Sequence, residues 1–297
     1  MPKAKIFEGI EIVKLVRFGE AGNEKPGIVD HDERVRDASE VVAKLDGATV
    51  VDAIAAIKGI DVSNLPVVEP NVRLGVPITG VGKLLCIGRN YEEHAAETGN
   101  TVLEEPIVFS KATSSISGPN DNVVIPKNSE KSDWEVELGV VIGKVARYVA
   151  LEDALDHIVG YCIVNDVSER AFQLERSGQW VKGKSCDTFA PIGPWLVTKD
   201  EIEDPQNLSL STTVNGVRYQ DGNTRDMVFG VAYLVHYLSQ FMSLHPGDII
   251  ATGTPSGIGM ALDPPVFLKP GDVMELEIDG LGKQQQNVVG YEPGMLG

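Results

Sequence analysis

Cysteine is scarce in this sequence. Only three are present among 297 residues, and they are Cys86, Cys162 and Cys186, with no CxxC spacing between them. An odd, scattered set excludes a disulfide framework and indicates a reducing compartment. Long apolar runs are also missing, since no stretch of about 18 apolar residues could form a transmembrane helix and the first residues lack a signal-peptide run. We therefore expect a cytoplasmic enzyme or binding protein that does not associate with membranes.

Positive charge is in short supply as well. Lys and Arg total 26 against 43 Asp and Glu, which gives a formal net charge of −17. Nucleic-acid binding needs a basic patch that releases counterions from phosphates, and the sequence contains none. The same negative charge disfavours anionic membrane surfaces. It is still compatible with a small anionic substrate, because a bound cation can reverse the field inside one pocket.

Glycine and proline, by contrast, are abundant. The sequence has 31 Gly and 17 Pro, and 42% of its residues are hydrophobic. This composition predicts many turns and short strands around a sizeable core rather than a helical bundle. Pro66, Pro70 and Pro77 punctuate the chain, and we place a boundary there. We expect a small N-terminal domain over residues 1–76 and a larger domain over residues 77–297.

Apolar runs between turn-forming residues predict the strands. They lie at 12–18, 26–29, 34–37, 84–87, 123–125, 138–142, 161–164, 208–214, 248–251 and 273–278, with a short helix near 50–57. The runs at 138–142 and 161–164 are apolar on both faces, as in strands covered on two sides. A second helix is predicted from Val228 to Met242, with Asn223 or Thr224 as its N-cap. The predicted fold class is mainly β with some helix (α+β).

Two glutamates flank Val136 just before the apolar run at 138–142. In a strand, side chains at i and i+2 share a face, so Glu135 and Glu137 are expected to point the same way, with Trp134 on the other face. Carboxylates this close repel each other unless a cation or proton lies between them. The alternative is a solvated strand face, although the buried run that follows makes such an edge less expected.

Asp166 follows the apolar run that ends at Asn165. A carboxylate at the end of a buried strand sits on a rigid scaffold and is well placed to bind a ligand. Alternatively, it caps a helix that begins near 168–170. Together with Glu135 and Glu137 it makes an all-oxygen set, which suits Mg²⁺, Mn²⁺ or Ca²⁺ better than zinc.

His94 and Glu97 lie three residues apart in a segment that looks like a short helix after a strand. At that spacing the two side chains meet on one helical face, and a histidine oriented by a glutamate is a usual general base near neutral pH. The alternative is an exposed pair that stabilises the helix by a few tenths of a kcal/mol.

Two further segments contain residues suited to ligand binding. Gly183-Lys184-Ser185 lacks the full GxxxxGK[ST] pattern and its strand–loop–helix context, so we reject a nucleotide site there. Lys184 could instead stabilise an enolate beside a metal-bound carbonyl. The small residues of 252–259 would let backbone N–H groups approach a ligand closely, and the alternative is a plain turn.

These segments occur in an order that resembles the fumarylacetoacetate hydrolase family. The resemblance covers about residues 83–289. Its carriers are Gly88-Arg89-Asn90-Tyr91 with His94, Glu135-Val136-Glu137, Asn165-Asp166-Val167-Ser168, Lys184-Ser185 with Asp187-Thr188, and Thr252-Gly253-Thr254-Pro255. One such motif is weak, whereas five in order are specific. The resemblance implies a rolled, mixed β-sheet catalytic domain, a small N-terminal domain and a homodimer.

The resemblance also implies roles for individual residues. It implies that Mg²⁺ or Mn²⁺ is bound by Glu135, Glu137 and Asp166. It implies a His94–Glu97 dyad on a mobile lid segment and an active-site lysine at Lys184. The implied substrate-binding residues are Arg89, Tyr91, Arg170, Gln173 and Thr254.

Family members act on 2-oxo acids that chelate the metal, and the metal acts as a Lewis acid. The segments at 223–227, 264–272 and 278–282 look most like the subgroup acting on 2,4-diketo-3-deoxy sugar acids derived from rhamnonate or fuconate. The expected reaction is hydrolysis of a carbon–carbon bond in a 2,4-dioxo acid, which yields pyruvate and a second acid. Oxaloacetate decarboxylation, or isomerase or lyase chemistry on a 2-oxo acid, is the alternative at the same site. A non-catalytic metal site is a third interpretation, and the set His94, Glu97 and Lys184 argues against it.

Overall fold

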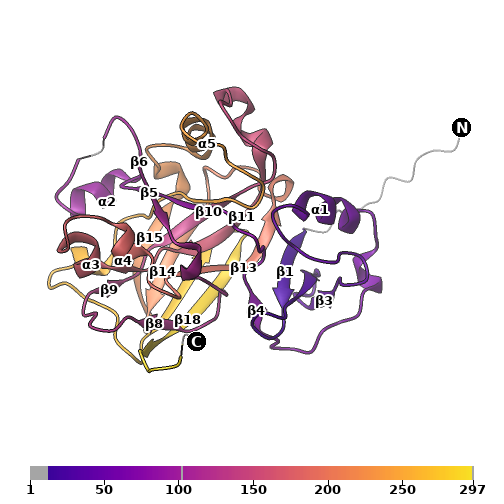
Figure 1. Ribbon diagram of the computed structural model, residues 1–297, viewed down its shortest axis with the longest axis horizontal. Coiled ribbons are helices and arrows are strands. Elements are labelled where there is room, and N and C mark those ends of the chain that lie inside the picture. The colour runs from indigo at the N-terminus through magenta and orange to yellow at the C-terminus, as the bar shows by residue number, and fades with distance from the viewer. Residues whose placement is uncertain (1–12, 102, 296–297) are drawn as a thin grey trace, which may run out of the picture.

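The structure is a computed structural model that describes residues 13–101 and 103–295. Strands predominate in it, with shorter helices between them, which confirms the predicted mainly β class. Figure 1 shows the strands of the N-terminal segment at one end of the molecule, beside a larger body in which two sheets face each other. The site described below lies in the larger body.

The first sheet joins strands from both parts of the chain. Its members are β1 (Lys14–Phe18), β2 (Lys25–Val29), β3 (Val35–Asp37), β4 (Leu74–Gly75), β5 (Leu84–Gly88), β6 (Ile107–Lys111), β7 (Ile116–Ser117), β10 (Val136–Ile142), β11 (Ile158–Asn165), β13 (Ala190–Thr198) and β16 (Ile249–Ala251). They are ordered β3–β2–β1–β13–β11–β10–β16–β5–β6, with β4 beside β1 and β7 beside β13. The β16–β5 and β13–β7 pairs are parallel and the others antiparallel, so the sheet is mixed.

The second sheet takes four of its five strands from the C-terminal half of the chain. It contains β8 (Val123–Ile125), β14 (Ser209–Val214), β15 (Val217–Asn223), β17 (Val273–Ile278) and β18 (Gly282–Gly290), ordered β15–β14–β17–β18–β8. A short ladder pairs β9 (Ser132–Asp133) with β12 (Ser168–Glu169). The α-helices are α1 (Val50–Lys58), α2 (Glu92–Glu97), α3 (Arg170–Leu174), α4 (Val181–Lys184) and α5 (Val231–Ser239). The 3₁₀ helices are η1 (Val62–Asn64), η2 (Thr113–Ser115), η3 (Leu151–His157), η4 (Lys199–Glu201), η5 (Thr224–Asp226) and η6 (Gly259–Ala261).

Strand β10 shows why its sequence is apolar on both faces. Leu138 and Val140 pack in one core with Leu276 of the second sheet. Val141 points the other way, into a core that it shares with Leu15 of β1. Alternate side chains of a strand leave opposite faces, so a strand between two cores needs apolar residues at successive positions. The predicted burial of 138–142 and 161–164 on two sides is therefore confirmed.

The N-terminal segment joins the larger body through main-chain pairing. Lys14 and Leu15 of β1 pair with Val197 and Leu196 of β13. The predicted strands at 26–29 and 34–37 and the helix near 50–57 are confirmed as β2, β3 and α1, whereas Ile12 lies outside the described residues. A division into domains 1–76 and 77–297 stays a prediction.

The helix predicted from Val228 to Met242 was wrong at its start and its end. Helix α5 runs only from Val231 to Ser239, with Gly230 at its N-cap. Asn90 explains the late start, because its backbone carbonyl accepts the N–H of Val228 and its side-chain oxygen accepts the N–H of Phe229. Those bonds hold Val228 and Phe229 in a bend before the helix. The predicted cap Asn223 instead caps η5, where its side chain accepts the N–H of Arg225.

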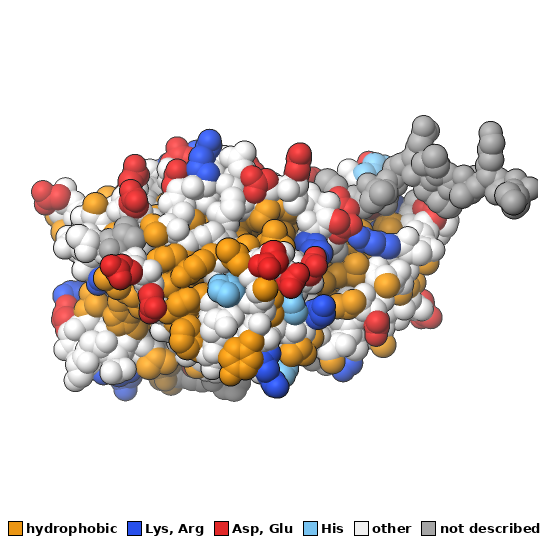
Figure 2. All heavy atoms as spheres, turned by 90° about the horizontal axis from the view of Figure 1, so that it is seen from above, with side chains coloured by type: hydrophobic (Ala, Val, Ile, Leu, Met, Phe, Trp, Pro, Cys, Tyr) orange, Lys and Arg blue, Asp and Glu red, His pale blue; other side chains and the backbone are white. Residues whose placement is uncertain are grey.

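The surface above α5 is apolar. Figure 2 shows hydrophobic side chains gathered on the face seen from above, where α5 and its neighbour η3 lie. The exposed large apolar residues of these two elements and the loops beside them are Val145, Tyr148, Leu151, Leu155 and Phe241. None of the helices in residues 13–101 and 103–295 is both long enough and apolar enough to cross a membrane.

Candidate active site

The candidate site is a cavity of about 140 Å³ in the larger body. Most of the residues singled out from the sequence line it: Arg89, His94, Glu135, Glu137, Arg170, Gln173, Lys184 and Thr254. Two others lie just behind the wall, since Glu97 bonds to His94 and Asp166 to Lys184. Tyr91 does not line this cavity but a neighbouring one beside Asp226. The structure thus brings together residues that are up to 165 positions apart in the sequence.

Three buried carboxylates meet because two strands end together. Glu135 immediately precedes β10 and Asp166 immediately follows β11, and the two strands pair with Val136 opposite Asn165. The N–H of Asp166 donates to the carbonyl of Glu135 at 2.9 Å, which closes the ladder. One carboxylate oxygen from each of Glu135, Glu137 and Asp166 lies within 4.8 Å of the other two. The expected shared face of Glu135 and Glu137 is therefore present, and the solvated-face alternative is wrong because both side chains are buried.

The alternative role of Asp166 as a helix cap is also wrong. Ser168 and Glu169 form strand β12, and α3 begins only at Arg170. Its N-cap is Glu169, whose side chain accepts the N–H of Ala171. The carboxylate of Asp166 is therefore free to face the cluster.

Two buried lysines and one arginine surround the carboxylates. Lys184 Nζ lies 2.8 Å from Glu135 Oε2 and 2.6 Å from Asp166 Oδ2, while Lys111 Nζ lies 2.5 Å from Asp166 Oδ1. Arg170 Nη2 lies 2.7 Å from Glu135 Oε1. Burial on its own would raise the pKa of Glu135, but Lys184 and Arg170 outweigh it and hold that pKa well below its usual range. Burial would lower the pKa of Lys184, and Asp166 and Glu135 raise it instead, so the lysine stays an ammonium.

Among residues 13–101 and 103–295, no cation contacts Glu137, and its one hydrogen bond is from the N–H of Gly253, at 2.9 Å. Burial, followed by the charges of Asp166 and Glu135, raises the pKa of Glu137. A buried carboxylate beside two others costs free energy unless a positive charge approaches it. The cluster therefore fits a divalent cation on the side that Glu137 faces, since its donors are all hard oxygens.

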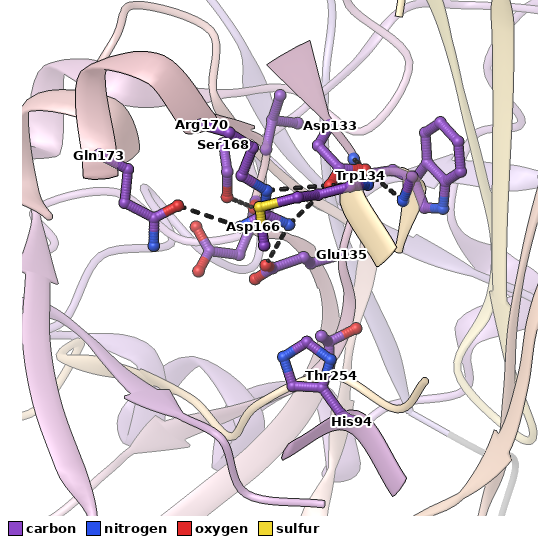
Figure 3. Close-up of polar contacts among 12 residues, drawn as sticks. His94, Asp133, Trp134, Glu135, Asp166, Ser168, Arg170, Gln173 and Thr254 are labelled. Carbon is purple, nitrogen blue, oxygen red and sulfur yellow. Dashed lines mark hydrogen bonds and ion pairs between the residues drawn. The ribbon is translucent and has the colours of Figure 1, made fainter. Parts of the chain in front are cut away.

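Asp133 anchors Arg170 and a neighbouring loop. Its Oδ2 accepts from Arg170 Nε at 2.9 Å and from the N–H of Met260 at 3.0 Å, and its Oδ1 accepts from the N–H of Gly259 at 2.7 Å. Arg170 Nη1 donates to Gln173 Oε1 at 3.1 Å. Figure 3 shows Asp133, Arg170 and Gln173 on one side of Glu135, with Trp134 directed away from it. Arg170 is thus held in one orientation at the cavity wall.

His94 approaches from the opposite side of the cavity, as Figure 3 shows. It lies on α2, and its Nδ1 is 2.8 Å from Glu97 Oε1. The other oxygen of Glu97 accepts the N–H of Gly257 at 2.8 Å, which ties α2 to the 252–259 loop. Because an ionised carboxylate can only accept, His94 carries its hydrogen on Nδ1 when neutral and presents Nε2 as an acceptor. The structure therefore pairs His94 with Glu97 as the spacing predicted.

Sequence reasoning missed Lys111 and Asp133. Lys111 ends β6, a strand that was not predicted, and it is buried against Asp166 and the carbonyl of Val167. Asp133 directly precedes the predicted glutamate strand, yet its partners lie at positions 170, 259 and 260. A lysine among apolar residues in Ile107-Val108-Phe109-Ser110-Lys111 was the available signal for the first. No local pattern pointed to the second.

The fold and this charged cavity define a class of proteins, and comparison with known proteins places the chain in it. Residues 83–289 match the model of the family described as fumarylacetoacetate (FAA) hydrolase, C-terminal. The chain belongs to the fumarylacetoacetate hydrolase family. This confirms the predicted resemblance and the rolled β-sheet fold that it implied.

Individual relatives cover nearly the whole chain. A 2,4-didehydro-3-deoxy-L-rhamnonate hydrolase from a Sphingomonas species is 53% identical over 277 residues, which are 93% of this chain and 96% of that protein. The structure of a fumarylacetoacetate hydrolase from Exiguobacterium antarcticum matches with a TM-score of 0.83 and 34% identity, covering 94% of this chain and 100% of the other. A maleylpyruvate hydrolase from a Sphingobium species, solved with manganese(II) and pyruvate, matches with a TM-score of 0.77 and 31% identity over 94% of this chain and 100% of the other.

Proposed function

We propose that this chain is a metal-dependent hydrolase that cleaves a carbon–carbon bond in a 2,4-dioxo acid, to give pyruvate and a second carboxylic acid. The observation that carries the proposal is the placement of the His94–Glu97 pair across one cavity from three buried carboxylates. The names of the relatives support it, because one is a 2,4-didehydro-3-deoxy-L-rhamnonate hydrolase and another was solved with pyruvate. A 2,4-diketo-3-deoxy derivative of rhamnonate or fuconate is the proposed substrate.

Glu135, Glu137 and Asp166 are the proposed ligands of Mg²⁺ or Mn²⁺. Their oxygens lie close enough together to share one ion, and Glu137 lacks a cationic partner among the described residues. When bound, the ion supplies Lewis-acid polarisation of a chelating 2-oxo acid and neutralises negative charge. Oxygen donors discriminate poorly between the two metals, so we name both.

His94 is the proposed general base. Its Nε2 takes a proton from water while Glu97 stabilises the resulting imidazolium. The water oxygen forms a bond to C4 of the substrate, and the C3–C4 bond then breaks with its electron pair passing to C3. The second acid leaves with the water oxygen, and a proton delivered to C3 completes pyruvate. One water is consumed and no redox partner is needed.

The remaining cavity residues position the substrate in this scheme. Lys184 is held as an ammonium by Asp166 and Glu135, so it offers positive charge where an enolate oxygen develops. Arg170 and Gln173 are held together at the wall, and we propose that they contact the substrate carboxylate or carbonyl. Arg89 and Thr254 line the same cavity and are proposed substrate contacts. Tyr91 stays a prediction, since it lines the neighbouring cavity.

Decarboxylation of oxaloacetate, or isomerase or lyase chemistry on a 2-oxo acid, is the second candidate. A decarboxylase would use the carboxylate cluster and Lys184 but needs no activated water. The direct His94–Glu97 contact therefore favours hydrolysis.

The deciding experiment is a panel of 2-oxo and 2,4-dioxo acids assayed with Mg²⁺, with Mn²⁺ and with EDTA. We expect pyruvate and a second acid from the dioxo acids, with turnover abolished by EDTA. If the protein releases carbon dioxide from oxaloacetate and cleaves no dioxo acid, the hydrolase proposal is wrong and decarboxylation is the function.

We also propose a homodimer and a cytoplasmic location. Exposed apolar residues of η3 and of the loops beside η3 and α5 lie on the face where Figure 2 shows hydrophobic side chains gathered, and such faces mark protein contacts. Sedimentation equilibrium of the wild type should give twice the chain mass. A Phe241→Asp variant, placed on this face, should shift that mass towards the monomer.

A further inference from the structure

The hydroxyl of Thr254 is turned into the protein, although the residue lines the cavity. Its Oγ1 donates to the carbonyl of Val136 at 2.9 Å and accepts from Gln220 Nε2 at 2.7 Å. Thr254 and His94 line the same cavity, and Thr254 is only 2% exposed. Its side chain is thus engaged with β10 and β15 before any ligand is considered.

Gln220 fixes the direction of that hydroxyl. This fully buried residue of β15 accepts the N–H of Val136 at 3.0 Å through Oε1 and donates to the carbonyl of Pro255 at 2.9 Å through Nε2. A backbone N–H can only donate and a backbone carbonyl can only accept, so the two ends of the amide cannot be exchanged. Nε2 must therefore donate to Thr254 Oγ1. The hydroxyl proton goes to Val136 and is not available to a ligand.

The backbone N–H of Thr254 is in the opposite situation. No acceptor for it is found in the part of the chain that the structure describes. The N–H of Gly253, one residue earlier, donates to Glu137 Oε2, and Gly253 has a positive φ of 97°. Successive N–H groups next to such a residue form a concavity that binds anionic oxygens. Buried N–H groups nearly always have a partner, and Thr254 lines the cavity, which makes a ligand there a candidate acceptor for this group.

We propose that Thr254 binds the ligand through its backbone N–H, and that Gln220 is the positioning residue that holds this peptide in place. The acceptor is a carboxylate or carbonyl oxygen of a 2-oxo acid, which is the part of the inference that rests on the proposed function. Gln220 itself touches no ligand. It acts through Thr254 and Pro255 on one side and through the start of β10 on the other.

The test measures oxalate binding by calorimetry in the presence of Mn²⁺, beside KM and kcat for a dioxo acid. Gln220→Leu removes all four hydrogen bonds of the amide with little change in volume. We expect the dissociation constant of oxalate and KM to rise about tenfold or more, because a hydrogen bond to a charged oxygen is weakened, while kcat changes little. Thr254→Val should produce the same shift, and Thr254→Ser, which keeps the hydroxyl, should recover most of it.

Two further variants separate positioning from a direct contact. The double variant Gln220→Leu/Thr254→Val should lose no more affinity than either single variant. Both changes break the same hydrogen bond, from Gln220 Nε2 to the hydroxyl of Thr254. Thr212→Val removes only the hydroxyl that donates to Gln220 Oε1 from the far side, at 2.8 Å. It should lower the melting temperature without changing oxalate affinity.

Several results would overturn the inference. Additive losses in the double variant would show that the Thr254 hydroxyl contacts the ligand directly. Wild-type affinity in Gln220→Leu, with only a lower melting temperature, would make Gln220 purely structural, and a wild type that binds no oxalate would remove the anion site. If oxalate affinity falls as expected but no dioxo acid is cleaved, the proposed function fails and the positioning role stands.

Discussion

Asp30 in the N-terminal segment and Glu137 in the cavity are both buried carboxylates, yet their surroundings differ. Asp30 accepts from Arg36 Nε at 2.6 Å, from Arg34 Nε at 3.1 Å and from the N–H groups of Asp32 and Arg34. Arg36 in turn donates to the carbonyls of Ser63 and Leu65. Glu137 accepts one backbone N–H and otherwise faces two carboxylates.

The difference separates a buried charge whose partners are complete from one whose partners are not. In the N-terminal segment the partners are complete, so the ion pair holds β2, β3 and η1 together. In the cavity the carboxylates outnumber the cations in contact with them, since Asp133, Glu135, Glu137 and Asp166 face Lys111, Lys184 and Arg170. An excess of buried charge facing a cavity is a cost that a bound cation can offset.

The largest expected effect is on activity at Glu137. Glu137→Gln keeps an acceptor for Gly253 but removes one proposed ligand charge. We expect kcat/KM to fall by about 10³-fold or more, because metal catalysis contributes several kcal/mol. In EDTA the melting temperature should stay the same or rise, because a charge is removed from beside two others. The checks are steady-state kinetics, metal titration and thermal unfolding, with exposed Glu277→Gln on β17 as the control.

A loss at Glu137 confined to stability, with metal affinity and turnover intact, would contradict the assignment of the cavity. Glu137 would then be, like Asp30, a buried carboxylate that contributes to stability alone.

The next largest effect is expected on turnover when His94, the proposed general base, is replaced. His94→Ala should lower kcat by about 10²–10⁴-fold, the range for loss of a general base, while oxalate affinity with Mn²⁺ stays near wild type. Glu97→Gln should have a smaller effect, because it removes the group that orients His94 rather than the base itself. Unchanged hydrolysis in His94→Ala would remove the dyad from the mechanism and leave the second candidate function.

The third effect is on stability in the N-terminal segment. Asp30→Asn leaves the buried guanidinium of Arg36 without its carboxylate, and breaking a buried pair costs about 3 kcal/mol at the low end of the usual range. The low end of the range applies because Arg34, the second arginine that contacts Asp30, is half exposed and stays hydrated when the carboxylate is removed. Urea unfolding should show the loss, and kcat/KM of the folded protein should be unchanged. Equal damage to turnover would mean that the two regions are coupled.

The smallest effect is the pH dependence of that same pair. Burial would raise the pKa of Asp30, but the N–H of Arg34 and the side chain of Arg36 outweigh it and place the pKa well below its usual value. A lowered native pKa contributes stability above the unfolded value of about 3.9 and loses it as the pH falls further. The difference in unfolding free energy between wild type and Asp30→Asn should be constant above about pH 5 and shrink below pH 4. A difference that does not shrink would mean that Asp30 titrates normally.

The sequence alone predicted the elements whose signals are local. The runs at 84–87, 123–125, 138–142 and 161–164 are apolar because they are buried, and each lies within an observed strand. The i, i+2 spacing of Glu135 and Glu137 and the i, i+3 spacing of His94 and Glu97 correctly predicted which side chains share a face.

Features that depend on distant partners escaped prediction. Strand β13 contains Pro191 and Pro194, which normally argue against a strand inside a sheet. Strand β18 contains Gln284 and Gln286, which are buried because each finds an amide partner. The start of α5 depends on Asn90, more than a hundred residues earlier. Such positions are determined by tertiary contacts that no short window of sequence contains.

The pairing of β1 with β13 has a practical consequence. Strand β13 lies between β1 and β11, and β11 leads directly to Asp166. Removing the N-terminal segment would leave Leu196 and Val197 of β13 without their partner strand, because β7 pairs only with Ala190 and Pro191. Their main-chain groups would be open to another extended chain. We therefore expect the N-terminal segment to block strand addition at this position, and a truncated protein that lacks it should self-associate even though it retains every residue that lines the cavity.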